Sequence, residues 1–129
     1  MLNFYKGLIR RKEKSNMDEK LIEQIYDTLG CQEEQTKAII RKVLKDIALF
    51  DKKQHDYGPD NIAKFGVTGV LVRSSDKLER LINLYNRDDA PSVQESIEDS
   101  WQDLSVYGAI ARGCIDGDWG GGFAKKVQL

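Results

Sequence analysis

Apolar residues recur along most of the chain at spacings of three and four, which is the repeat of a helix with one buried face. Four stretches carry this repeat, at about residues 17–29, 33–52, 67–86 and 93–112. The residues expected to be buried are, in chain order, Leu21, Ile22, Ile25, Leu29, Ile39, Ile40, Val43, Leu44, Ile47, Phe50, Val67, Leu71, Leu78, Ile82, Tyr85, Val93, Ile97, Trp101 and Leu104. No stretch shows the strict alternation of a strand. We therefore predict an all-α fold, a compact bundle of about four helices.

Turn-forming residues separate these stretches. Gly30 is expected to stop the first helix, and the segment KQHDYGPDNIAKFG, residues 53–66, is expected to form the main internal loop. Ser92 and Glu95 match a capping box, in which a serine hydroxyl and an acid three residues later bond the free backbone amides of a helix start. This pair predicts that the fourth helix begins near Val93.

The two ends of the chain differ from the helical part. Residues 1–16 form an arm rich in Lys and Arg, and residues 17–129 are expected to form a single helical domain. The C-terminal tail, CIDGDWGGGFAKKVQL, carries too many glycines to continue a helix. We expect it to pack irregularly through Trp119 and Phe123.

Charge and composition restrict the kinds of function. The 129 residues suit one domain, and 20 Lys and Arg against 21 Asp and Glu give no field that favours nucleic acid. Two cysteines and one histidine do not make a zinc site. No apolar run approaches the roughly 20 residues that cross a bilayer, and the first residues do not resemble a secretory signal, so a cytoplasmic location away from membranes is expected.

A row of acids on the fourth helix is the first candidate site. Glu95, Asp99 and Asp103 recur every turn, and Val106 and Ile110 continue the same ridge. An acidic ridge that becomes apolar should border another helix or subunit.

The third helix adds Asp76 and Glu79, one turn apart. Carboxylates from two helices can hold Mg²⁺ and leave positions free for phosphate oxygens. The alternative is that these acids lie on exposed helix surfaces and pair with Lys or Arg.

The predicted internal loop is the second candidate. It joins the only histidine, His55, to Asp56, Tyr57 and a flexible glycine, with Asn61 close behind. An aromatic ring and an amide can stack on a nucleobase and hydrogen-bond to it. Equally, Tyr57 could pack inward while Asp56 and Asn61 close local turns.

Three segments, HDYGPDNIAKFG, GVLVRSSDKLERLINL and ESIEDSWQDLSVYG, together resemble the phage and bacterial family called nucleotide modification associated domain, type 1. The likeness covers about residues 50–112. It is carried by Asp56, Tyr57, Gly58, Arg73, Asp76, Lys77, Arg80, Leu81, Glu95, Ser96, Asp99 and Asp103.

That family is similar in layout to the all-α NTP pyrophosphohydrolases, the group of MazG-like enzymes and dimeric dUTPases. In that group, acids from two helices bind Mg²⁺ and activate water. This chain departs from their EExxE and ExxD motifs, since the first reduces to Asp76 and Glu79 and the second spreads over Glu95, Asp99 and Asp103.

The resemblance implies Mg²⁺-dependent hydrolysis of a nucleoside triphosphate to a monophosphate and pyrophosphate, in the bacterial host cytoplasm if the protein is phage-encoded. The roles it implies are catalysis by Glu95 and Asp99, metal binding by Asp76, Glu79, Glu95, Asp99 and Asp103, phosphate binding by Arg73, Lys77 and Arg80, and base or sugar binding by Asp56, Tyr57 and Asn61.

Two alternatives stay open. The first is a non-catalytic protein that binds a nucleotide or a nucleotide signal in the same cleft, and the second is a helical protein-interaction module. A homo-oligomer is also expected, because Val106, Tyr107 and Ile110 form a second apolar face on the fourth helix.

Overall fold

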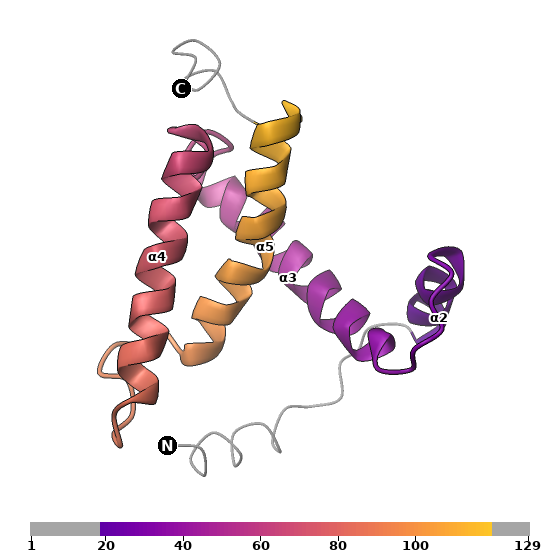
Figure 1. Ribbon diagram of the computed structural model, residues 1–129, viewed down its shortest axis with the longest axis horizontal. Helices are drawn as coiled ribbons and strands as arrows, with labels where there is room; N and C mark the ends of the chain where they lie inside the picture. Colours follow the sequence, from indigo (N-terminus) through magenta and orange to yellow (C-terminus); the bar gives the residue numbers. More distant parts are fainter. Residues whose placement is uncertain (1–18, 120–129) are drawn as a thin grey trace. The chain divides into compact units, whose positions relative to one another are not determined.

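The computed structural model describes residues 19–119, and within this range the chain forms helices and no strands. The helices are α2 (Glu19–Thr28), α3 (Thr36–Tyr57), α4 (Gly66–Tyr85) and α5 (Ile97–Asp116), as Figure 1 shows. The predicted all-α fold is confirmed. The basic arm of residues 1–16 and Phe123 of the tail lie outside the described residues.

The chain divides within α3 into two compact units, the first ending at Lys45 and the second beginning at Asp46. The boundary between the units falls inside residues 17–129, the stretch predicted to form a single domain. In the first unit α2 is amphipathic and buries Ile22 completely. The carboxylate of Glu19 accepts two hydrogen bonds from Arg41, at 3.0 and 2.8 Å, which joins α2 to the first half of α3. Gly30, with φ of +69°, follows the end of α2 as expected.

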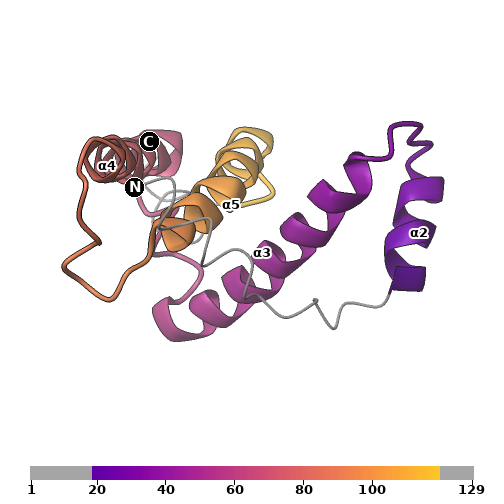
Figure 2. The same cartoon turned by 90° about the horizontal axis from the view of Figure 1, so that it is seen from below.

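In the second unit α4 and α5 lie side by side, and both Figures 1 and 2 show their axes adjacent. The apolar core of this unit comes from both helices and from the turn before α4. It consists of Ala63, Val70, Leu81, Leu84, Ile97 and Ile110. The ring of Trp119 packs on Phe50 with 5.4 Å between centroids, so the predicted packing of the tail through Trp119 is confirmed.

The buried face of α4 is not the predicted one. Leu71, Leu78 and Ile82 are exposed, while Val70, Leu81 and Leu84 are buried against α5. These buried residues form a ridge about a quarter turn away.

The hydrophobic pattern did not predict this ridge, because the polar residues Ser74 and Lys77 occupy its middle. Ser74 Oγ donates to the carbonyl of Val70 at 2.8 Å and Lys77 pairs with acids, so both polar groups are satisfied beside the core.

Two helix boundaries also differ from expectation. α3 continues to Tyr57 before Gly58, with φ of +79°, ends it, so His55, Asp56 and Tyr57 lie on a helix rather than in a loop. α5 begins four residues later than Ser92 and Glu95 predict.

Ser96 and Asp99 make the capping box of α5. The Asp99 amide donates to Ser96 Oγ at 3.1 Å, and the Ser96 amide donates to Asp99 Oδ2 at 2.7 Å. Ser92 and Ser96 both have an acid three residues later, so the pattern alone did not distinguish them.

None of the helices between residues 19 and 119 is both long and apolar enough to cross a membrane.

The two serines provide a matched test of the helix start. Ser96→Ala removes the N-cap acceptor of α5 and should lower the free energy of unfolding by about 1 kcal/mol in urea denaturation. Ser92→Ala, in the preceding loop, should change it by less than about 0.5 kcal/mol. A larger loss at Ser92 than at Ser96 would place the cap where the sequence pattern first suggested.

Candidate functional site

A cavity of about 760 Å³ lies within the second unit, bounded by the last turns of α3, the following loop, α4 and α5. This volume is in the range of small-molecule sites. Its wall is rich in charge, with cationic and anionic side chains in similar number. The charged lining residues are Asp46, Lys53, Arg73, Asp76, Lys77, Arg80, Glu95, Asp99 and Asp103.

Lys77 of α4 is the centre of an ion-pair network in this wall. Its ammonium lies 2.6 Å from Glu95 Oε1 and 2.8 Å from Asp103 Oδ2. The other oxygen of Asp103 lies 2.6 Å from Lys53 Nζ on α3. The Asp103 side chain is only 14% exposed and that of Lys77 only 22%, so water screens these pairs less than it screens surface pairs. The network links α3, α4, α5 and the segment that precedes α5.

The network shifts the pKa values of its members. Partial burial acts to raise the pKa of Asp103, but hydrogen bonds from Lys53 and Lys77 outweigh it and hold that pKa below its usual value. Burial acts to lower the pKa of Lys77, yet its bonds to Asp103 and Glu95 raise that pKa above the usual value. Burial, followed by the charge of Asp103, raises the pKa of Tyr107. The network therefore favours the charged forms of Asp103 and Lys77, and Tyr107 is kept neutral.

Arg80 fastens the beginning of α5 to α4. Its guanidinium donates to Ser100 Oγ at 2.7 Å, to the Ser96 carbonyl at 3.1 Å and to the Glu95 carbonyl. Ser100 is completely buried, and this bond satisfies its hydroxyl. The donors of Arg80 are thus directed at the protein, which gives this arginine a structural role, and its role in phosphate binding stays a prediction.

Tyr57, Asn61 and Arg73 form one edge of the cavity. Tyr57 ends α3 and its residue surface is 69% exposed, while Asn61 Oδ1 accepts a hydrogen bond from Arg73 at 3.1 Å. A guanidinium has five N–H donors, so Arg73 can bind Asn61 and still offer donors to a ligand. This edge joins an aromatic ring, an amide and an exposed cation.

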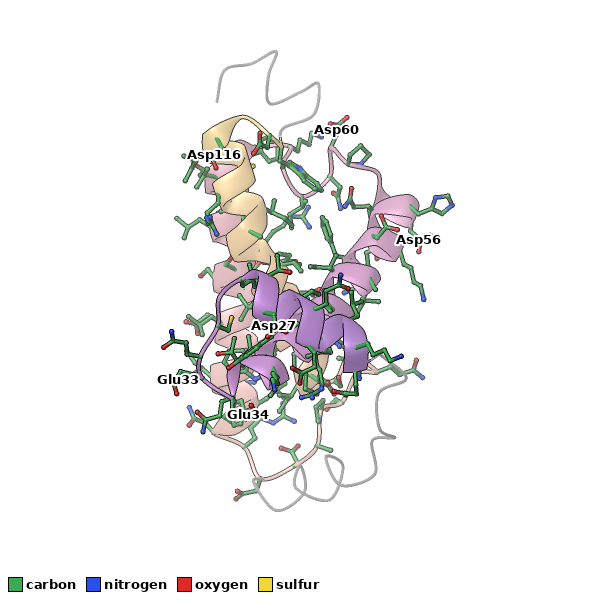
Figure 3. All side chains as sticks on the ribbon, turned by 90° about the vertical axis from the view of Figure 1, so that its right-hand side faces the viewer. Asp27, Glu33, Glu34, Asp56, Asp60 and Asp116 are labelled. Atoms are coloured by element: carbon green, nitrogen blue, oxygen red, sulfur yellow. The ribbon has the colours of Figure 1, made fainter. Side chains whose placement is uncertain are left out.

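Some predicted site residues do not line the cavity. Asp56 lies on the last turn of α3 with its side chain directed outward, as Figure 3 shows, and His55 beside it is also exposed. Glu79 is exposed on α4 outside the cavity wall. Since α3 continues through residues 55–57, the side chains there diverge around a helix, and only Tyr57 reaches the cavity.

The carboxylates, as arranged, do not fit a Mg²⁺ site. Asp103 has both oxygens bound by lysines, Glu95 Oε1 accepts from Lys77, and Asp99 Oδ2 accepts from the Ser96 amide and hydroxyl. Among residues 19–119 no group of three His, Cys, Asp or Glu side chains is placed to hold a metal ion. Asp76 lines the cavity on α4 but joins no such group. Glu95 also precedes α5, so the predicted row of acids is not on one helix.

Lys53, which lies opposite Asp103 in the structure, was not among the predicted site residues. Its signal was weak, because it is one of many lysines and its partner lies 50 positions away. The acidic ridge itself was informative, since Asp99, Asp103, Val106 and Ile110 do line the cavity together, bordering other helices as expected.

Asp103→Asn tests the network through pH. The folded pKa of Asp103 is lowered from its unfolded value of about 3.9, so its contribution is complete above about pH 5 and is lost as pH falls through the folded pKa. At pH 7 the variant should lose about 1–3 kcal/mol of unfolding free energy, and the difference should shrink in acid. Asp76→Asn, at an exposed aspartate of the same cavity, is the control. A loss at Asp103 that is independent of pH would contradict the ion-pair account.

Comparisons with protein-family models, with curated proteins and with solved structures find no match to this chain. The resemblance of residues 50–112 to nucleotide modification associated domains therefore stays a prediction. A function has to be argued from the cavity and its chemistry.

Proposed function

We propose that the second unit binds a nucleotide, with the phosphates at Arg73 and Lys77 and the base at Tyr57 and Asn61. The observation that carries this proposal is the edge of the cavity at which Tyr57, Asn61 and Arg73 meet. The resemblance in sequence points to the same ligand class.

The phosphate end rests on Arg73. This side chain is exposed at the cavity wall, and its planar guanidinium suits two oxygens of one phosphate. Lys77 lies one turn further along α4, so it follows Arg73 on the same side of the helix. A phosphate that reaches Lys77 takes the place of the Glu95 carboxylate, which is the more exposed of its two partners at 39%.

The base end rests on Tyr57 and Asn61. The exposed tyrosine ring offers a face on which a base can stack, and such stacking contributes about 1–3 kcal/mol. The Asn61 amide has a donor group left when its oxygen accepts from Arg73, and that donor can bond an acceptor on a base or sugar. Bonding to Arg73 also fixes the direction of the amide.

The proposal is a binding function, and it contains no hydrolytic step. The acids that would hold Mg²⁺ are bonded to Lys53, Lys77 and the capping amide. Hydrolysis of a triphosphate to a monophosphate and pyrophosphate is implied by the resemblance alone. Binding needs only the cations and the aromatic edge.

The test is a thermal-shift panel in which ligand binding raises the melting temperature by mass action. Nucleoside triphosphates should stabilise the protein more than monophosphates, and nucleosides least. Arg73→Gln should weaken triphosphate binding about tenfold, equivalent to about 1.4 kcal/mol, and should leave the unliganded melting temperature nearly unchanged. Arg112→Gln, at an exposed arginine of α5 outside the cavity, should bind like the wild type.

Three results separate the alternatives. No shift with any nucleotide would favour a helical interaction module and end the proposal. Equal affinity for a nucleoside and its triphosphate would show that Arg73 and Lys77 do not bind the phosphates. Release of pyrophosphate that requires Mg²⁺ would show that the carboxylates leave their lysine partners when substrate binds, and the protein would then be an enzyme.

A further inference from the structure

The residues predicted to form the buried face of α4 are instead exposed, and they still lie on one side of the helix. This surface, the α4 stripe, consists of Val67, Leu71, Leu78, Ile82 and Tyr85, with exposed fractions from 38% to 67%. Trp101 of α5 extends it, because its Nε1 lies 3.4 Å from Tyr85 Oη. A contiguous row of half-exposed large apolar residues is typical of a contact surface.

Four residues of the α4 stripe are placed symmetrically about one point of the helix. Leu71 and Leu78 are equally distant from the point between Ser74 and Ser75, and so are Val67 and Ile82. When two copies of a helix pair antiparallel about a two-fold axis, each residue meets the one at the mirrored position of the other copy. Leu71 then meets Leu78 of the second copy, and Val67 meets Ile82. Both of these contacts pair two apolar side chains of similar size.

The centre of the α4 stripe suits a helix crossing. Ser75 is small and exposed, and Ser74, at the border with the buried ridge, is small as well, so no bulky side chain keeps two helix backbones apart where they cross. Ser74 Oγ already donates to the Val70 carbonyl at 2.8 Å, so its hydroxyl loses little when it is covered. The charged residues of α4 lie on other sides of the helix, including Arg73, Lys77 and Arg80 in the cavity wall.

We propose that the α4 stripe is a homodimer interface, in which α4 of one copy packs antiparallel on α4 of a second copy. Aromatic side chains present about 150–250 Å² each and aliphatic ones less, so at exposed fractions of 38% to 67% the stripe and Trp101 together expose on the order of 500 Å² per copy. Two copies together give about 1,000 Å², near the lower limit for a specific interface. The self-complementary order of the residues points to a second copy rather than to another protein.

This surface replaces the one from which a homo-oligomer was first expected. Ile110 is only 4% exposed within the chain, while Val106 and Tyr107 line the cavity. Those residues have neighbours inside the second unit. The exposed apolar surface that a second copy could cover is therefore on α4 and not on α5.

The experiment is light scattering coupled to size exclusion, over protein concentrations up to hundreds of micromolar. The wild type should reach twice the chain mass of 14.7 kDa. Leu71→Asp and Leu78→Lys should each return the particle to one chain mass while circular dichroism shows unchanged helicity. The control is Leu29→Asp in the first unit, because Leu29 and Leu71 are both 67% exposed. It should leave the dimer intact.

Mixing the two variants tests the antiparallel register. A carboxylate at position 71 of one copy then faces an ammonium at position 78 of the other, so the mixture should form dimers that neither variant forms alone. A wild type that stays at one chain mass overturns the proposal, and this includes the case in which residues 19–45 cover the α4 stripe. A dimer that survives Leu71→Asp, or variants whose mixture stays monomeric, also overturns it.

Discussion

The arrangement of the helices in the second unit depends on the ammonium of Lys77. It lies between the carboxylates of Glu95 and Asp103, and Lys53 closes the network from α3. Removing one partner would leave a partly buried charge without compensation, which costs more than the intact network contributes. The network therefore fixes how α3, α4 and α5 stand around the cavity. Arg80 adds to this by holding the first turn of α5 through two backbone carbonyls and the buried Ser100.

Most of the helical layout could be predicted from the sequence, and the packed side of α4 could not. Within residues 19–119 the number and order of the helices, and the end of α2 just before Gly30, follow from apolar spacing and turn residues, and the structure agrees. The packed side of α4 did not follow, because its ridge contains Ser74 and Lys77 between Val70 and Leu81. A hydrophobic pattern treats a lysine as exposed, whereas this one is satisfied by two acids beside the core. The start of α5 was ambiguous for a separate reason, since Ser92 and Ser96 offered the same capping pattern.

The candidate site could be predicted in outline. The ridge from Asp99 to Ile110 and the residues Tyr57, Asn61 and Arg73 do meet at one cavity. The roles of the acids could not be read from spacing, because spacing does not show which cations lie opposite. Lys53 comes from another helix and pairs with Asp103, Lys77 pairs with Glu95 and Asp103, and Asp99 caps α5. A nucleotide phosphate bound as we propose would compete with these carboxylates for the same cations.

Nuclear magnetic resonance during titration with a nucleoside triphosphate tests this account most directly, because each backbone amide gives its own signal. Backbone amides around Tyr57, Asn61, Arg73 and Lys77 should shift together and saturate with one affinity, and those of Glu95 and Ser96 should follow as Lys77 changes partner. Saturating shifts confined to residues 19–45, or a spectrum that does not change, would contradict the account.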